Sequence, residues 1–356
     1  MKRILVSIIA CSVAATAAQA QGGNEQKSGT AGASELLINP WAQSSGMANA
    51  HTAGVRGVEA IRLNVGGLSR VESTEILFST TQWLKGSEIQ IHSFGMAQPI
   101  GDNGGVLGFE VMAFDLGDFY ATTEAAPDGN SLFDVNYTNI GLSYSKAFSN
   151  SIFGGITVRG VSESIPDASA LGVCFDAGIQ YVTTVGPLEG ANNLRIGVSL
   201  KNVGPAMKFT GDGTQRRVNI ETGNLAEEEI TVELPTQQME IPSQLNIGAA
   251  YDFNLAEDHR ITVAGNFASN SYSLDQFQGG VEYSFMNMFM VRGGLDYQKN
   301  IFDEMNTRVA ANGPTAGATV QVPFGEEKSK RFGVDYSYRS TRVFSGTHSI
   351  GIRLSL

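Results

Sequence analysis

The chain ends in Ser349-Ile-Gly-Ile-Arg-Leu-Ser-Leu356, a stretch in which apolar and polar or small residues alternate without a break. The four aliphatic side chains fall on one face, and serine, glycine and arginine fall on the other. Because successive side chains of a β-strand point to opposite faces, this pattern predicts a strand with one apolar face.

The same period of two extends back from the C-terminus to Thr74. Most of the segments that carry it are 10 to 12 residues long, whereas strands of soluble domains usually have about 5–6 residues. A tilted membrane-spanning strand needs about 9–11. The pattern predicts fourteen strands, at residues 74–84, 87–99, 104–115, 137–148, 151–161, 169–184, 192–203, 242–253, 258–269, 275–286, 288–298, 314–323, 331–340 and 347–356.

The connections between these strands differ in length. Ser149-Asn150 and Asn287 are short turns, while 116–136, 204–241 and 299–313 are long loops. Short turns and long loops on opposite ends are typical of outer-membrane barrels. We therefore predict an all-β fold, a transmembrane outer-membrane β-barrel of about 14 antiparallel strands with an N-terminal plug segment; a soluble β-sandwich or propeller is the alternative. A weaker strand pair is expected within 206–234.

Composition is consistent with a large β protein. Glycine contributes 42 of 356 residues, about 12% against a usual share of roughly 7%. Charged residues make up 17% of the chain, below the roughly 25% of soluble domains. The formal charge is −11, and this acidic balance argues against a nucleic-acid partner.

The first 20 residues resemble a secretory signal peptide. Lys2 and Arg3 precede an apolar run, and Ala18-Gln19-Ala20 forms a cleavage site. A lipoprotein signal ending at Cys11 is the alternative, and either one predicts export. With the predicted barrel, we expect the chain in the outer membrane of a Gram-negative cell. Residues 21–35 are expected to form a flexible leader. Cleavage would leave Cys174 as the only cysteine, so no intrachain disulfide is expected.

Residues 36–73 differ from the rest because they show neither a strand period nor a helical stripe. Their apolar side chains are expected to be buried against another part of the protein. A fourteen-stranded barrel encloses a lumen too wide for the strand side chains alone to fill. We therefore predict that 36–70 plug the barrel formed by 74–356 or close its periplasmic mouth; a disordered tether is the alternative. Two plug arginines are expected to pair with lumen acids: Arg56 and Arg62 with Asp252, Glu282 or Asp335.

Catalytic signatures are missing from the sequence. The four histidines have no metal-ligand spacing, and no hydrolase elbow, Walker loop or dinucleotide fingerprint occurs. Asp115 and Asp118 flank a strand end, where a solvated loop rim is the simpler interpretation than a cation site. We therefore expect no enzymatic activity, no cofactor and no metal.

Several short boxes resemble the PorV/PorQ family of outer-membrane proteins, part of the wider FadL-like barrel group. Two lie in the plug segment and the others follow strands, in an order similar to that of the family. Gln43 stands where arginine is usual and Val65 where proline is usual. The residues that carry the resemblance are Pro40, Trp41, Gly46 and Met47; Asn64, Gly67 and Leu68; Trp83; Asn202, Gly204 and Pro205; and Glu282 and Tyr283.

The resemblance implies a non-enzymatic binding and shuttle component of type IX protein secretion and surface attachment. Its partners would be outer-membrane lipid, the secretion translocon and exported cargo proteins with C-terminal signals, and the long loops would bind them. The alternative is a FadL-like transporter of hydrophobic small molecules, with a hydrophobic ligand or detergent in the barrel. Plug residues offer an apolar lining for that ligand: Leu36, Leu37, Ile38, Trp41 and Met47.

Overall fold

The computed structural model describes residues 24–101, 104–123, 126–186, 192–222, 226–303, 305, 307, 309–325 and 330–356. The predicted signal peptide, including Cys11, lies outside the described residues, as do the first residues of the predicted leader. The domain boundaries proposed from the sequence stay predictions.

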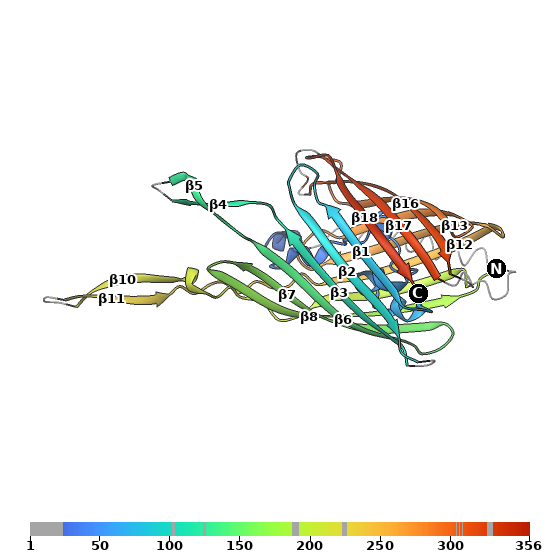
Figure 1. Cartoon of the computed structure of the whole chain (residues 1–356), viewed down its shortest axis with the longest axis horizontal. Coiled ribbons are helices and arrows are strands. Elements are labelled where there is room, and N and C mark those ends of the chain that lie inside the picture. Colours follow the sequence, from blue (N-terminus) through green and yellow to red (C-terminus); the bar gives the residue numbers. More distant parts are fainter. Residues whose placement is uncertain are drawn as a thin grey trace.

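Fourteen antiparallel strands close into one barrel, in which each strand pairs with its neighbours along the chain and β1 pairs with β18 (Figure 1). This confirms the predicted fold class. The barrel strands are β1 (Glu75–Gln82), β2 (Gln90–Pro99), β3 (Val106–Asp115), β6 (Asn136–Ala147), β7 (Ile152–Ile165), β8 (Ala168–Thr183), β9 (Leu194–Val203), β12 (Gln244–Ala256), β13 (His259–Asn270), β14 (Gln276–Phe285), β15 (Phe289–Gln298), β16 (Ala311–Phe324), β17 (Lys330–Thr341) and β18 (Thr347–Ser355).

The barrel has two unlike ends. We call the end at which β1 begins and β18 finishes the terminal end, and the opposite one the loop end. The long connections leave from the loop end, and two of them carry hairpins that project beyond the wall at the left of Figure 1. These are β4 (Phe119–Thr123) with β5 (Ala126–Phe133), and β10 (Gln215–Thr222) with β11 (Ala226–Glu233).

One hairpin was expected and the other was not. The β10–β11 pair falls within the segment predicted to hold a weak strand pair. The β4–β5 hairpin corrects the prediction that 116–136 is only a loop. Gly129 lies within β5 at a φ of 86°, a conformation that glycine tolerates, beside the irregular pairing of β4 with β5 between Ala121 and Thr123.

The outer face of the barrel is apolar. On β9, Ile196, Val198 and Leu200 are exposed, while Arg195, Ser199 and the other alternate residues point into the lumen and are buried. Exposed and buried residues alternate in the same way on most barrel strands. Apolar side chains thus face outward and polar ones inward, the reverse of the arrangement in a soluble protein. Such a surface is stable where its solvent is lipid.

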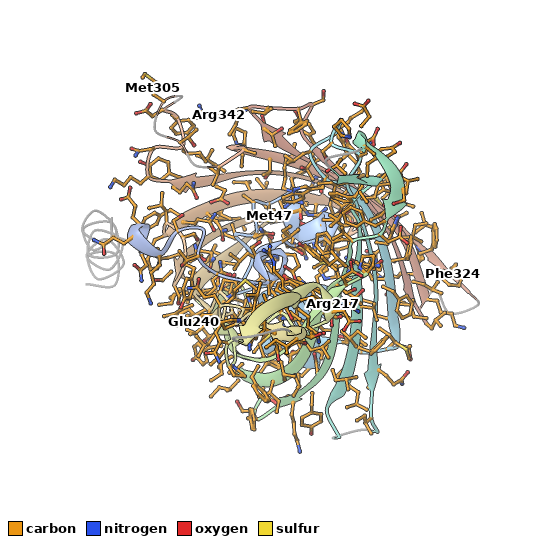
Figure 2. All side chains as sticks on the ribbon, turned by 90° about the vertical axis from the view of Figure 1, so that its left-hand side faces the viewer. Met47, Arg217, Glu240, Met305, Phe324 and Arg342 are labelled. Carbon is orange, nitrogen blue, oxygen red and sulfur yellow. The ribbon has the colours of Figure 1, made fainter. Side chains whose placement is uncertain are left out.

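Residues 24–73 form short helical turns and coil rather than strands. They include η1 (Glu25–Lys27), η2 (Ser34–Leu37), α2 (Ala42–Ser45), η3 (Gly57–Glu59), α3 (Ala60–Leu63) and η4 (Val65–Arg70); η5 (Asp212–Thr214) precedes the β10–β11 hairpin. Residues 36–73, which we call the plug, occupy the lumen, and Figure 2 shows Met47 within the ring of strands.

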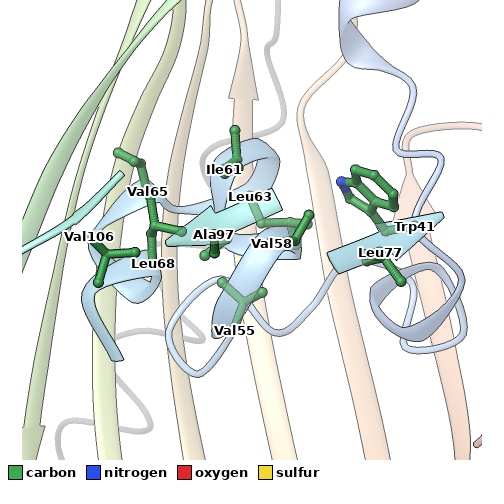
Figure 3. Close-up of a cluster of buried hydrophobic side chains, with 11 residues drawn as sticks. Trp41, Val55, Val58, Ile61, Leu63, Val65, Leu68, Leu77, Ala97 and Val106 are labelled. Carbon is green, nitrogen blue, oxygen red and sulfur yellow. The ribbon is translucent and has the colours of Figure 1, made fainter. Parts of the chain in front are cut away.

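Apolar plug side chains form the main buried cluster. Trp41, Val58, Ile61 and Leu68 pack together with lumen-facing residues of the first three strands (Figure 3). The core of this protein therefore lies between plug and wall. Among the described residues, no helix is long and apolar enough to cross a membrane.

Glycines on the lumenal face allow the plug backbone to approach the wall. A Cβ on Gly46 would lie 2.9 Å from the Cα of Gly317 on β16, closer than real Cβ atoms come. A Cβ on Gly280 of β14 would lie 2.9 Å from the carbonyl oxygen of Met47. Part of the glycine excess is thus explained by close contact between plug and wall.

Val263 on β13 provides a test of the outward face, because it is 42% exposed and lies between Tyr251 and Val281 on the neighbouring strands. We expect Val263→Arg to lower the unfolding free energy in lipid vesicles by about 2–4 kcal/mol, since it places a charge against hydrocarbon. Urea titration measures the difference. The control is Val218→Arg on the β10–β11 hairpin, where a surface change of within about 0.5 kcal/mol is expected. Equal losses for the two variants would contradict a lipid-facing wall.

Candidate functional site

The N-terminal residues run through the barrel from one end to the other. At the loop end, Lys299 Nζ lies 3.2 Å from Glu25 Oε2, and the Lys27 ammonium lies 5.2 Å from the centre of the Tyr272 ring. At the terminal end, the backbone N–H of Val58 donates to Glu75 Oε1 over 2.8 Å. The N-terminal residues 24–73 are therefore held at both ends of the lumen.

A buried ionic network joins the plug to three strands. Arg62 of the plug donates to Glu110 Oε1 on β3 over 3.1 Å, and Arg159 on β7 donates to the same oxygen over 2.7 Å. Arg159 also donates to Asp176 Oδ2 on β8 over 2.6 Å. These four side chains are at most 4% exposed, so each charge depends on its partners for the solvation that water does not supply.

A second network anchors the plug to the last strands. Arg353 Nη2 on β18 donates to Glu59 Oε1 of the plug over 2.8 Å and to Asp335 Oδ2 over 3.3 Å. The other oxygen of Glu59 accepts a hydrogen bond from the Ser44 backbone N–H over 2.9 Å. Gln43, which replaces the arginine usual at this position in the family it resembles, accepts from Arg353 over 2.6 Å.

The predicted ion-pair partners of the plug were wrong. Arg62 pairs with Glu110, and Arg56 has no carboxylate within 4.0 Å among the described residues. The three acids expected to receive these arginines are each held by an arginine of the wall: Asp252 by Arg195, Glu282 by Arg292 and Asp335 by Arg353. Plug–wall charge pairing does occur, but between other residues.

Two facing acids hold the start of the plug at the loop end. The backbone N–H of Ala33 donates to Glu163 Oε1 on β7 over 3.0 Å, and Glu35 is buried beside it. Burial first, and then the charge of Glu163, raise the pKa of Glu35 to about 8. This direction favours the protonated form of Glu35, which reduces the repulsion between the two acids.

The plug residues that carry the family resemblance pack into the lumen. Trp41 and Leu68 belong to the main buried cluster, and the Pro40 carbonyl accepts from Ser79 Oγ over 2.8 Å. The Asn64 amide donates to the Ile179 carbonyl on β8 over 3.0 Å. The remaining three contact backbone closely: Gly46 beside Gly317, Met47 beside Gly280 and Gly67 beside the Val55 carbonyl.

The strand residues of the resemblance do not converge on one site. Trp83 lies at the loop end with the Arg339 guanidinium 5.0 Å from its ring. Asn202 has a φ of 58° at an irregular pairing of β8 with β9. Gly204 and Pro205 begin the long connection from β9 to β12. On β14, Glu282 faces the lumen, and the Tyr283 hydroxyl lies 2.7 Å from His259 Nδ1 on the outer face.

A cavity of about 340 Å³ lies between the plug and the wall toward the loop end. Its apolar lining comes from the plug and from loop-end residues of the wall, namely Leu37, Ile38, Ala48, Leu63, Trp83, Leu84, Val309, Ala310, Ala311 and Pro314. Polar and charged residues also line it, among them Arg62, Lys201, Asp296 and Arg339 together with glutamines and asparagines of the wall. The cavity can hold a small ligand that is mostly apolar.

Only part of this lining was predicted. Leu37 and Ile38 do line the cavity, as expected for a ligand site. Leu36, Trp41 and Met47 lie in other buried clusters. The contributions of Trp83 and of residues 309–315 were missed, because the sequence does not reveal which loop-end residues the closure of the barrel brings over the plug.

The wall beside the cavity is interrupted. Pairing of β15 with β16 ends at Leu295 and Pro314, although β15 continues to Gln298. Pro314 has no N–H to donate to a neighbouring strand, and the register of β16 with β17 shifts between Ala311 and Thr315. This is a weak seam in the barrel, and the residues that form it also line the cavity.

Acid, histidine and cysteine side chains do not gather into a metal site in the part of the chain that the structure describes. Cys174 is buried and unpaired. Asp115 does not lie with a second acid as a ligand set; its Oδ1 accepts the Gly117 backbone N–H over 3.1 Å.

No family model and no curated protein matches the chain. Solved structures do. The TodX monoaromatic hydrocarbon channel deltaS2 mutant aligns with a TM-score of 0.51 and 12% identity over 89% of this chain and 98% of that one. A Pseudomonas aeruginosa FadL homologue aligns with a TM-score of 0.48 and 10% identity, over 88% and 97% of the two chains. The Pseudomonas putida toluene transporter TodX gives 0.46 and 12%, over 85% and 93%. The chain thus shares the fold of the first of these structures.

The ionic network makes a prediction about stability. Arg159→Met leaves Glu110 and Asp176 buried with fewer partners, and we expect it to lower the unfolding free energy by about 3–5 kcal/mol. The control is Arg260→Met, because Arg260 is 27% exposed and its partner Glu282 keeps Arg292; we expect a loss of at most about 1 kcal/mol. Urea unfolding in vesicles measures both, and similar losses would argue against a special role for the network.

Proposed function

We propose that the chain is a non-enzymatic channel of the outer membrane that binds and passes small hydrophobic molecules. The observation that carries this proposal is the apolar-lined cavity of about 340 Å³ between the plug and the loop end. It lies within the range of ligand pockets. It is lined by residues from the plug, the loops and the wall together, as a site on a path through the barrel would be.

The interrupted wall supplies a route out of this cavity. The side of the barrel at Pro314 has few cross-strand hydrogen bonds to break, whereas the path through the plug is blocked by buried ion pairs. A hydrophobic molecule that leaves between β15 and β16 enters lipid, its preferred solvent. We propose that passage is lateral, through this seam.

The shared fold supports the transport proposal. The similar structure with a TM-score of 0.51 is named as a channel for monoaromatic hydrocarbons. Its low identity of 12% gives no guidance on which molecule this chain takes. The class of ligand, small and largely apolar, therefore comes from the cavity of this chain.

The type IX shuttle function implied by the sequence resemblance stays a prediction. The hairpins β4–β5 and β10–β11, which project from the loop end, are the surfaces such a function would use. Since no family model and no curated protein matches the chain, these comparisons give the shuttle function no support. Purification from outer membranes with a translocon protein or secreted cargo attached would favour it over transport.

Tryptophan fluorescence can test ligand binding, because the chain has only two tryptophans, Trp41 and Trp83. Trp83 lines the cavity, whereas Trp41 is 1% exposed in the plug core. We expect bromobenzene to quench the fluorescence of the purified protein saturably, because the heavy atom would sit beside Trp83. Trp41→Phe should keep this quenching and Trp83→Phe should lose most of it.

A cavity-filling variant completes the test. Ala310→Phe places a phenyl ring where the ligand would sit, and we expect it to weaken binding of bromobenzene by about tenfold or more. It should also slow uptake of the compound into vesicles that contain the protein. Quenching that is unsaturable, or equal in Trp83→Phe and Trp41→Phe, would contradict a ligand site in this cavity.

A further inference from the structure

A second cavity of about 460 Å³ lies on the other side of the plug, toward the terminal end. We call it the terminal chamber. Plug residues separate it from the first cavity: Met47 and His51 line the chamber, whereas Ala48 and Thr52 line the cavity at the loop end. The chamber is lined by six arginines, namely Arg56, Arg70, Arg195, Arg260, Arg331 and Arg353, and by four acids, namely Glu59, Glu72, Glu75 and Glu282.

Three of the arginines are already engaged by carboxylates. Arg353 lies 2.8 Å from Glu59 Oε1 and 3.3 Å from Glu75 Oε1. Arg260 lies 3.6 Å from Glu282, which also accepts from Arg292 of the wall, and Arg195 pairs with Asp252. These contacts account for the lining acids apart from Glu72, which is exposed.

Arg56 and Arg70 lack such a partner. Arg70 Nη1 donates to the neutral Gln180 amide over 3.2 Å, and its guanidinium stacks 5.6 Å from the centre of the Phe153 ring. Among the described residues, no carboxylate lies within 4.0 Å of Arg56 or Arg70. Arg56 is exposed and Arg70 is half-buried, and no carboxylate of the described residues forms an ion pair with either, although Asp252 and Glu72 act on the charge of Arg56 from a greater distance.

Arginines that line the terminal chamber carry buried N–H groups without a hydrogen-bond partner among the described residues. Arg195 is 3% exposed and its Nε has no hydrogen-bond partner in the described part of the chain. The Nε of Arg260 is also buried without a partner. Unsatisfied buried N–H groups are uncommon and mark places where an acceptor belongs.

The electrostatics agree with the geometry. Burial, and next the charge of Arg195, lower the pKa of Arg56. Burial, and next the charge of Arg56, lower the pKa of Arg70 to about 9. The pKa of His51 falls well below its usual value for the same two reasons, burial and Arg195, so His51 adds no charge. Within a chain of formal charge −11, this chamber concentrates positive charge that an anion would neutralise.

We infer that the terminal chamber is a binding site for an oxyanion, a phosphate or carboxylate group held by Arg56, Arg70 and Arg195. Planar guanidinium groups present paired N–H donors that match the oxygens of these anions. The group can belong to a free anion or to an anionic lipid headgroup at the mouth of the barrel. The site is separated by the plug from the hydrophobic cavity, so it does not depend on the proposed transport function.

Calorimetric titration of the full chain in a non-ionic detergent tests this inference. Inorganic phosphate is added at constant ionic strength, and dihexanoyl phosphatidate below its micelle concentration is the second probe. We expect saturable binding of phosphate to the wild-type protein. Phosphatidate that binds far more tightly than phosphate would identify the lipid headgroup as the source, and equal affinities would identify a free anion.

The variants test the role of the arginines. Arg56→Gln should weaken phosphate binding by about tenfold or more, since it removes a charge-assisted contact, and Arg56→Lys should retain part of the affinity. The control is Arg216→Gln on the β10–β11 hairpin, where an exposed arginine lies far along the chain from the chamber; its affinity should equal that of the wild type.

Thermal unfolding separates loss of a site from loss of the fold. Without added anion, Arg56→Gln should unfold at a temperature equal to or above that of the wild type, because the uncompensated charge is gone. Phosphate should raise the wild-type unfolding temperature and leave that of Arg56→Gln unchanged. No saturable binding to the wild type, or the same affinity in Arg56→Gln, would overturn the inference.

Discussion

Glu110 accepts hydrogen bonds from Arg62 of the plug and from Arg159 of the wall through one carboxylate oxygen. Removing any one of these groups leaves a buried charge with fewer partners, which costs several kcal/mol. The contact therefore fixes the depth at which the plug sits. With Arg353 and Glu59 on the other side of the lumen, it holds a segment that has little regular structure of its own.

The position of the plug decides the character of the space on either side. Residues 47–52 form the partition between the two cavities, and the side chains within this segment face opposite chambers. The cavity toward the loop end combines aliphatic and aromatic side chains with polar ones, while the terminal chamber is lined by six arginines and four glutamates. One short segment thus divides a lumen into a compartment suited to apolar molecules and another suited to anions.

Much of the barrel was predictable, because a strand that separates lipid from a wet lumen must alternate. The spacing of Ile196, Val198 and Leu200 is enough to identify the outer face of β9. The plug was predictable from its lack of that period together with residues such as Trp41. The sequence does not predict which plug residue forms an ion pair with which residue of the wall. Arg62 meets Glu110 rather than Asp252 because of where the plug lies against β3, and alternation carries no information about which strand a plug residue faces.

The hydrophobic cavity was only partly predictable for the same reason. Its lining joins Leu37 and Ile38 of the plug to residues some 270 positions later, at 309–315, and these meet only when β1 pairs with β18 to close the wall. Pro314 is the one feature of this region that the sequence does reveal, because proline has no backbone N–H to donate. A proline in a long membrane-type strand forfeits a ladder hydrogen bond, so Pro314 is a signal from which an interruption of the wall could have been predicted.

If the chain transports apolar molecules as we propose, the energetics of the two exits favour passage through the wall over passage past the plug. Moving the plug separates Arg62 from Glu110 and Glu59 from Arg353, and each broken buried pair costs about 3–5 kcal/mol. Opening the seam at Pro314 breaks few ladder bonds, because the pairing of β15 with β16 already ends there. An apolar ligand gains further free energy when it moves into lipid. In the transport that we propose, the ionic contacts that hold the plug would therefore leave the side of the barrel as the less costly way out.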